Sequence, residues 1–276
     1  MGSTSQFGSL VSVEWLHNHL NENNLLIFDA SMNKVTDNKT DYESSQIPNT
    51  QFFDIKYVFS DTSAPFPNTV PSEEKFSREA QNLGVNNNCK IVVYDDKGIY
   101  SSARVWYLFK AFGFENVAVL DGGLPEWKSK GYNLETKKAH SKTKGNFIAK
   151  YNPKAFKFFN DIQKSSNNSK HLIIDARSEN RFNGIVPEPR EGLRSGSIPN
   201  SVNIPFSKLL DKNCFKSTKQ IEEAFDIVNV KDEHLVFSCG SGITACILAL
   251  GAELIGKKNV SVYDGSWTEY GTLTKE

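Results

Sequence analysis

The sequence predicts an α/β protein built from two repeats of one domain, each with a mostly parallel sheet flanked by helices. Two observations carry this expectation. The first is an internal repeat: residues 25–30 recur as 171–176, and residues 120–127 recur as 263–270, offset by roughly 145 residues. The second is the form of the strands, which are short continuous apolar runs rather than alternating ones. Such runs are typical of a parallel sheet that is covered on both faces.

Each copy reads as strands that alternate with helices. The stretch 105–112 is rich in aromatic and aliphatic residues and stops at Gly113, a common residue at a helix end. An apolar stretch at 246–255 predicts a second helix. Because connections of this kind bring strands back side by side in the same direction, the alternation predicts parallel sheets. The strands themselves are expected at 25–30, 91–94, 116–120, 171–176 and 233–238.

The predicted boundaries place the first domain at residues 1–138, a linker at 139–152 and the second domain at 153–276. The linker is expected because the region from 135 to 152 is polar and carries no strong apolar period. One large α/β domain is the alternative organisation.

Composition excludes several partners. Lysine plus arginine number 32, as do aspartate plus glutamate, and this balance argues against nucleic acid or an anionic membrane as the main partner. No apolar run approaches the roughly 20 residues of a membrane span, and the N-terminus resembles neither a secretory signal nor a transit peptide. We therefore expect a cytoplasmic protein, and a monomer rather than a dimer. The four cysteines show no disulfide or metal-ligand spacing: Cys89, Cys214, Cys239 and Cys246.

The chemistry of the chain is expected at Cys239, which stands between a predicted strand and a predicted helix. Gly240 and Gly242 flank Ser241, so the backbone can curl tightly and turn its N–H groups inward. Such a ring of N–H groups, together with a helix N-terminus, stabilises a thiolate, which is the nucleophilic form of cysteine. The alternative is an inert buried cysteine.

The first copy has lost this nucleophile. Aligning the repeats places Asp95 opposite Cys239, and a carboxylate cannot carry a persulfide. We therefore predict that the first domain is inactive and helps to form the wall of the active cleft, because clefts between domains are common small-molecule sites.

Three other reactions fit the cysteine loop less well than sulfur transfer. A cysteine phosphatase needs an arginine six residues after the cysteine, where this chain has Ala245. A cysteine protease needs a histidine base, and only His234, on the incoming strand, is near in sequence. A redox pair between Cys239 and Cys246 is a further alternative. A persulfide, Cys–S–S⁻, is an anion that backbone N–H groups can stabilise without any charged side chain.

These residues resemble the tandem-domain rhodanese, or sulfurtransferase, family. The loop Cys239-Gly240-Ser241-Gly242-Ile243-Thr244 is similar to that of the family's mercaptopyruvate enzymes, whereas the thiosulfate enzymes have cationic residues after the cysteine. The resemblance extends over nearly the whole chain, including residues 181–190, 197–200 and 264–267.

The resemblance implies that Cys239 takes sulfur from 3-mercaptopyruvate and passes it to a small thiol, thioredoxin or cyanide, with no metal or organic cofactor. It implies that Arg181 and Arg190 bind the carboxylate of the donor, a role that suits guanidinium groups. An ion pair of these arginines with Glu188 or Glu191 is the structural alternative. Ser241 and Thr244 are expected to supply a proton or hydrogen bonds, or else only to cap the loop and helix. Gly240, Gly242 and Ile243 complete the expected substrate site.

Two positions depart from the family pattern. Where animal members have an acid and a histidine in the first domain, this chain has Lys56 and Asn68. We expect Lys56 to add positive potential over the cleft. Asp175 and Arg177 are expected to form a structural pair beneath the loop. Thiosulfate as the main donor, and a protein that only carries or scaffolds a persulfide, remain as alternative functions.

Overall fold

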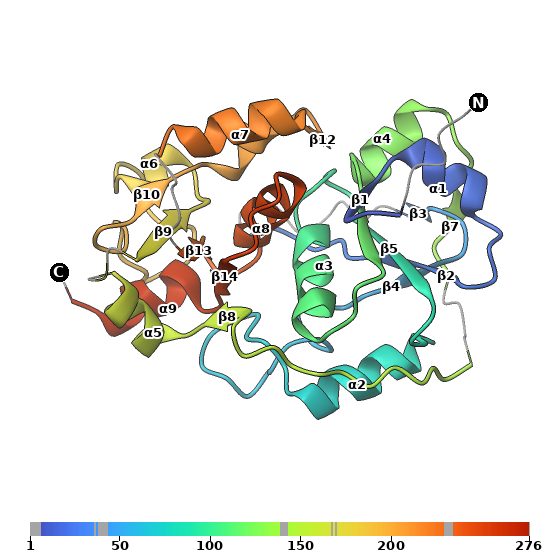
Figure 1. The fold of residues 1–276 in the computed structure, drawn as a ribbon, viewed down its shortest axis with the longest axis horizontal. Helices are drawn as coiled ribbons and strands as arrows, with labels where there is room; N and C mark the ends of the chain where they lie inside the picture. The colour runs from blue at the N-terminus through green and yellow to red at the C-terminus, as the bar shows by residue number, and fades with distance from the viewer. Residues whose placement is uncertain are drawn as a thin grey trace.

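The computed structural model describes residues 7–35, 37, 44–138, 143–166, 168, 170–228 and 234–275 and places two α/β halves side by side (Figure 1). The first half is built on a five-stranded sheet in which all neighbouring strands are parallel. Its strands lie in the order β1 (Leu10–Val11), β6 (Val117–Leu120), β5 (Lys90–Tyr94), β2 (Leu25–Asp29) and β4 (Thr50–Phe52).

The second half repeats this architecture. Its sheet is also parallel and five-stranded, and its strand order is that of the first sheet once each strand is replaced by its counterpart about 145 residues later. The predicted fold class and internal repeat are therefore confirmed. The order runs β8 (Phe156–Lys157), β14 (Val260–Tyr263), β13 (His234–Ser238), β9 (His171–Asp175) and β10 (Val202–Asn203).

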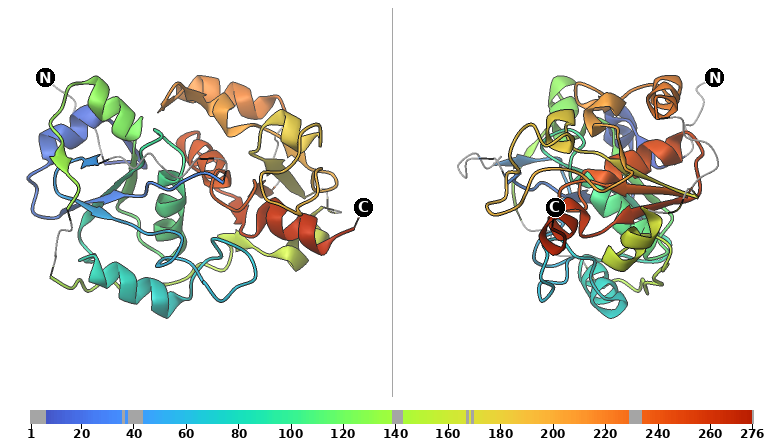
Figure 2. Two further views of the ribbon diagram at one scale, coloured as in Figure 1. Left: turned by 180° about the vertical axis from the view of Figure 1, so that it is seen from behind. Right: turned by 90° about the vertical axis from the view of Figure 1, so that its left-hand side faces the viewer.

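Helices cover both faces of each sheet, as Figure 2 shows from two further directions. In the first half these are α1 (Val13–His19), α2 (Glu73–Asn82), α3 (Ser102–Ala111) and α4 (Gly123–Ser129). In the second half they are α5 (Phe159–Ser165), α6 (Glu179–Phe182), α7 (Thr218–Asp226), α8 (Ala245–Leu254) and α9 (Ser266–Leu273), with a 3₁₀ turn at Phe206–Leu209. None of the described helices is both long and apolar enough to cross a bilayer.

The two halves share one core. Helices α3 and α8 lie against each other between the sheets (Figure 1), and nearly all of their residues are buried. Apart from Arg104 and Lys110 in α3 and Glu253 in α8, neither helix carries a charged residue, which is the pattern of a helix covered by protein all round. They correspond closely to the helices predicted at 105–112 and 246–255. The strand predicted from residue 233 begins at His234, and residue 233 lies outside the described residues.

The segment predicted as a linker is attached to the first half where it is described. Gly145 N–H donates to the Gln81 carbonyl at 2.8 Å, and Phe147 N–H donates to the Val85 carbonyl at 3.0 Å. The Phe147 ring is buried and lies 6.5 Å from the Phe76 ring of α2. Residues 139–142, which include the predicted start of the linker, lie outside the described residues.

Each half sends a segment to the other. In the first half, residues 53–72 precede α2, and Val70 N–H donates to Asp264 Oδ2 of the second half at 2.8 Å. In the second half the counterpart segment forms the hairpin of β11 (Leu210–Asp211) and β12 (Cys214–Phe215), and Phe215 N–H donates to Asp121 Oδ1 at 2.8 Å. These two contacts occupy equivalent positions of the repeat. The two halves are therefore held together by a pair of pseudo-symmetric hydrogen bonds. A smaller pair, β3 (Ser45–Gln46) and β7 (Glu135–Thr136), closes the edge of the first half.

Candidate active site

Cys239 lies where β13 ends and the chain turns toward α8. Its side chain borders a cavity of 210 Å³, although the residue as a whole is only 2% exposed. Both halves line this cavity, the first through Tyr100 and the second through Arg177 among others. The site residues predicted from the sequence meet here with one exception: Arg181, Arg190, Gly240, Ser241, Ile243 and Thr244 all line the cavity with the cysteine.

The exception is Gly242, which the sequence placed in the substrate site. It does not line the cavity, and its backbone has a left-handed φ of 75°. A Cβ atom here would lie 2.6 Å from the Asp264 carbonyl oxygen and 3.2 Å from Arg104 Nη1. Gly242 therefore allows the loop to turn tightly against Asp264 of its own half and Arg104 of the other half.

The expected ring of inward N–H groups needs a correction. The N–H groups of Cys239 and Gly242 both donate to Ser266 Oγ at 3.1 Å, so these two donors are occupied. Ser266 Oγ lies 3.9 Å from Cys239 Sγ, and the residue adopts a left-handed φ of 51°, which is uncommon outside glycine. Sequence reasoning missed Ser266. Within the described part of the chain, the amides of Gly240, Ser241, Ile243 and Thr244 have no acceptor and remain for an anion.

In the inactive half, the loop equivalent to the cysteine loop binds a carboxylate through its backbone amides. Asp95, at the position equivalent to Cys239, accepts hydrogen bonds through Oδ2 from the amides of Tyr100, Ser101 and Ser102 at 2.8–2.9 Å. Its Oδ1 accepts another from Lys97 N–H at 2.9 Å. The first-half loop is thus filled by its own carboxylate, and the fold of the loop is suited to binding an anion through backbone N–H groups.

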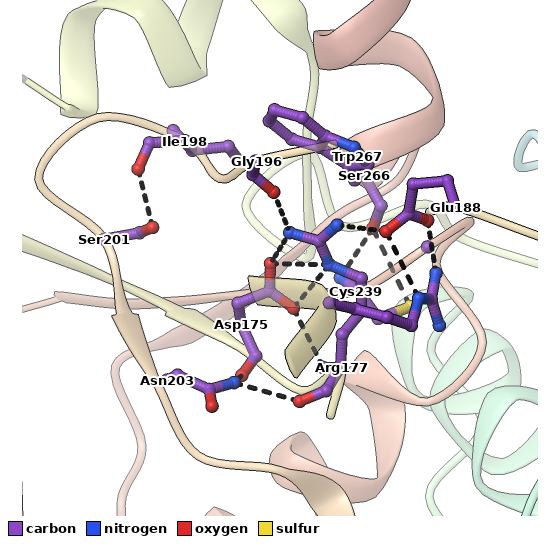
Figure 3. A network of polar contacts seen from close by, with 12 residues as sticks. Asp175, Arg177, Glu188, Gly196, Ile198, Ser201, Asn203, Cys239, Ser266 and Trp267 are labelled. Carbon is purple, nitrogen blue, oxygen red and sulfur yellow. Dashed lines mark hydrogen bonds and ion pairs between the residues drawn. The ribbon is translucent and has the colours of Figure 1, made fainter. Parts of the chain in front are cut away.

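A buried network formed by Asp175, Arg177 and Glu188 lies beside Cys239 (Figure 3). The half-buried Arg181 joins it through Glu188. Arg177 forms a bidentate pair with Asp175 at 2.7–3.1 Å and also donates to Glu188 Oε1 at 2.7 Å. Arg181 Nη2 donates to Glu188 Oε2 at 2.5 Å. Asp175 and Arg177 therefore pair as expected, and the ion pair of Arg181 with Glu188 that was the structural alternative is also present. Glu188 was not identified as a site residue from the sequence.

Arg181 nevertheless keeps one edge toward the loop. Its Nη2 atom lies 3.2 Å from where a Cβ would stand on Gly240, so a side chain at this position would crowd the guanidinium. Arg190 has a different environment: it donates to Thr268 Oγ1 at 3.3 Å, and no described carboxylate lies within ion-pair distance of it. Burial lowers the pKa of Arg190, and the negative charge of the Cys239 thiolate opposes that shift. Among the described residues, Arg190 thus has no carboxylate partner to neutralise its charge.

The first half reaches the loop through Asn68. Its Nδ2 donates to Ser241 Oγ at 3.1 Å and to the Ser241 carbonyl at 3.3 Å. Arg104 of α3, which was missed from the sequence, donates to the Asn68 carbonyl at 2.8 Å and to the Gly242 carbonyl at 3.3 Å. Lys56, by contrast, is exposed beside an aromatic ring and does not line the cavity, so the structure lends no support to its expected effect on the cleft.

The structure does not favour the redox pair or the cysteine protease that the sequence left as alternatives. Cys246 is fully buried, donates to the Gly242 carbonyl at 3.3 Å, and burial raises the pKa of its thiol to about 12, so it is a poor redox partner. His234 begins the strand that Cys239 follows, and its Nε2 is hydrogen-bonded to Ser261 Oγ at 2.7 Å.

Thr244 is the N-cap residue of α8 but makes no capping hydrogen bond through its side chain. Among the described residues no histidine, cysteine or acidic side chains gather in a group that could hold a metal ion.

Comparisons with known proteins agree with this geometry. The family described as "Rhodanese-like domain" matches residues 12–130 and again 159–272. The human 3-mercaptopyruvate sulfurtransferase is 38% identical over 98% of this chain and 94% of its own length. The mitochondrial thiosulfate/3-mercaptopyruvate sulfurtransferase 1 of Arabidopsis thaliana is 38% identical over 98% of this chain and 78% of its own.

A solved structure has the same overall fold. The crystal structure of SseA from Escherichia coli, described as a 3-mercaptopyruvate sulfotransferase with the rhodanese fold, superposes with a TM-score of 0.84. It is 33% identical, and the match covers 94% of this chain and 99% of that one. With two family matches, nearly full-length relatives and the same fold around Cys239, the chain belongs to the rhodanese-like family and carries two copies of its domain.

Proposed function

We propose that this protein is a sulfurtransferase that takes sulfur from 3-mercaptopyruvate onto Cys239 and passes it to a thiol, thioredoxin or cyanide acceptor. The observation that carries the proposal is the cavity itself, in which the thiol of Cys239 lies in a loop without charged side chains and Arg181 and Arg190 line the facing wall. The names of the human and Arabidopsis relatives support the same donor.

The donor fits this division of charge. Its carboxylate is held by Arg190, which has no carboxylate partner among the described residues, and by the free edge of Arg181. The Cys239 thiolate attacks the thiol sulfur, the carbon–sulfur bond breaks, and its electron pair leaves on carbon as the enolate of pyruvate. The proton of the donor thiol ends on that carbon, so the products are pyruvate and Cys239–S–S⁻.

Ser241 is placed to help this proton move. Its Oγ accepts from Asn68, which leaves its own O–H free to donate toward the cavity. An amide cannot act as a base, so Asn68 orients Ser241 without removing its proton. Thr244, with no capping bond, or water is the other proton carrier that the site offers.

Two other functions remain as alternatives. Thiosulfate as the main donor is favoured by the double name of the Arabidopsis relative, but the loop lacks cations for a sulfonate. A non-catalytic persulfide carrier would use the same cysteine. We also propose a cytoplasmic monomer, supported by four free cysteines and by exposed apolar side chains that are scattered along the chain. Cell fractionation and light scattering test these last two points.

Steady-state kinetics separate the possibilities. Pyruvate release from 3-mercaptopyruvate in the presence of cyanide should exceed thiocyanate formation from thiosulfate at equal donor concentration. The Cys239→Ser variant should fall to background with both donors. A preference for thiosulfate would favour the first alternative, and negligible turnover of wild-type protein with both donors would favour the carrier.

A further inference from the structure

A second cavity lies beside the one that holds Cys239. It has a volume of 290 Å³ and shares three wall residues with the catalytic cavity, namely Lys34, Tyr100 and Phe206. Lys97 and Lys212 are among its remaining lining residues. A molecule seated in this outer cavity is therefore next to the place where the transferred sulfur is held.

Unpaired positive charge faces the outer cavity. Lys97 is largely neutralised, because its Nζ lies 3.1 Å from Asp96 Oδ1 and 3.6 Å from Asp37 Oδ2. Lys34 lies with its ammonium over an aromatic ring of the shared wall, and Lys212 is exposed on the β11–β12 hairpin. Neither of these two lysines has a carboxylate within ion-pair distance in the part of the chain that the structure describes.

The donor, 3-mercaptopyruvate, does not need the charge of Lys34 and Lys212 for its binding. It carries one carboxylate, and Arg181 and Arg190 already supply guanidinium groups for that carboxylate in the inner cavity. The second substrate must instead bring its sulfur to the outer sulfur of the persulfide. The aromatic walls of Tyr100 and Phe206, whose rings are 6.5 Å apart, favour a small organic molecule there.

We propose that the outer cavity is the acceptor subsite and that it selects a small thiol carrying two or more carboxylates. This inference rests on the proposed function. In the transfer step, the acceptor R–SH and Cys239–S–S⁻ give R–S–S⁻ and Cys239–SH. The sulfur–sulfur bond to Cys239 breaks, a new one forms to the acceptor, and the thiol proton passes to Cys239 Sγ.

The test compares mercaptosuccinate, a thiol with two carboxylates, with the neutral 2-mercaptoethanol as acceptors for the full chain under saturating 3-mercaptopyruvate. Lys212→Gln and Lys34→Gln are measured beside Lys219→Gln, a control at an exposed lysine on α7. Each acceptor is scored as the ratio of variant to wild-type kcat/KM, which cancels the intrinsic reactivity of the thiol.

We expect each cavity variant to lose about three- to fivefold more with mercaptosuccinate than with 2-mercaptoethanol, and Lys219→Gln to lose nothing with either. The difference should shrink between about 0.02 M and about 0.5 M salt. Equal losses with both acceptors, or none, would overturn the acceptor subsite. Pyruvate released in a single turnover without acceptor reports the donor step separately, so its absence in wild-type protein would count against the proposed function instead.

Discussion

Arg104 and Asp264 form an ion pair 2.7 Å long in which both side chains are only 1% exposed, although 160 residues separate them in the sequence. Arg104 comes from α3 of the inactive half, and Asp264 directly follows β14 of the active half. Through the same guanidinium, Arg104 also holds the carbonyls of Asn68 and Gly242. The inactive half thus fixes the back of the catalytic loop by buried, charge-assisted hydrogen bonds.

Removing this arginine should destabilise the protein strongly. Arg104→Met keeps much of the side-chain volume but leaves Asp264 buried without its partner, so the free energy of unfolding should fall by about 3–5 kcal/mol. Urea denaturation measures the change. Arg78→Met is the control, because Arg78 pairs with Glu79 at the surface and is 58% exposed, and an exposed pair contributes at most about 1 kcal/mol. Similar losses in the two variants would show that the buried pair has no special role.

Asn68 should matter for turnover because its amide group holds Ser241. Asn68→Asp keeps the shape and tolerates the left-handed φ of 62°, but it replaces a donor by an acceptor that faces the Ser241 carbonyl. We expect kcat to fall at least about tenfold, which corresponds to about 1.4 kcal/mol, with a smaller change in the KM for donor. The matched control is Asn213→Asp at the equivalent position of the repeat, which lies against Gly98 of the inactive loop. Equal effects of both substitutions on kcat would contradict the role of Asn68.

Ser266 should be needed for the shape of the cysteine loop. Ser266→Ala leaves the N–H groups of Cys239 and Gly242 without an acceptor, at a cost of about 1–3 kcal/mol for each buried donor. We expect kcat/KM to fall by about 10- to 100-fold. Ser266→Gly also removes the hydroxyl but relieves the left-handed backbone, so the difference in unfolding free energy between the two variants isolates the backbone strain. Full activity in both would show that Ser266 does not organise the loop.

Arg190 should act on donor binding rather than on stability. Arg190→Lys retains the charge but loses the planar fork that matches a carboxylate, so the KM for 3-mercaptopyruvate should rise about tenfold while the urea midpoint stays close to that of wild type. Inhibition by pyruvate should weaken in parallel, because the product carries the same carboxylate. An unchanged KM would remove Arg190 from the donor site.

Cys246 should be inert at ordinary pH. Burial raises the pKa of its thiol to about 12, so at pH 8 only about one molecule in 10⁴ carries the thiolate, and iodoacetamide should modify Cys246 in urea but not in the folded protein. The folded state binds this proton more tightly than the unfolded state does. The unfolding free energy should therefore decline as the pH rises from about 9 toward 12. The decline should be shallower in Cys246→Ala, and an identical slope in the two proteins would contradict the shift.

The sequence was sufficient for features that local patterns encode. Continuous apolar runs predicted the parallel strands, and the repeat predicted two domains of one fold, whose sheets the structure shows to have the same strand order. Arg181 and Arg190 were expected in the donor site from the resemblance to the rhodanese family, a role that suits guanidinium groups, and the structure places both on the wall of the Cys239 cavity. The strands and the repeat needed only residue type and spacing, whereas the two arginines needed the family resemblance.

The contacts between the two halves could not be predicted from residue type and spacing. Arg104 lies in an apolar helix whose other residues pack well, and its partner lies in the other half, so no local period marks the pair. The helix carries two charges, Arg104 and Lys110, and nothing in the sequence marks Arg104 as the buried one. The Ser266 hydroxyl reaches the loop because Ser266 has a left-handed backbone, and this conformation cannot be predicted from a serine in the sequence. Asn68 was noticed only as a departure from the family, and the crossing of its segment to Ser241 appears only once the fold is assembled.

The central claim is that Cys239 carries the sulfur, and intact mass spectrometry tests it most directly. Reduced protein is mixed with 3-mercaptopyruvate or, separately, with thiosulfate, while pyruvate is assayed. The account predicts one added sulfur, located at Cys239 and absent in Cys239→Ser, with pyruvate formed in equal amount from 3-mercaptopyruvate and little addition from thiosulfate. Pyruvate formation without added sulfur on Cys239, or the same addition in Cys239→Ser, would contradict it.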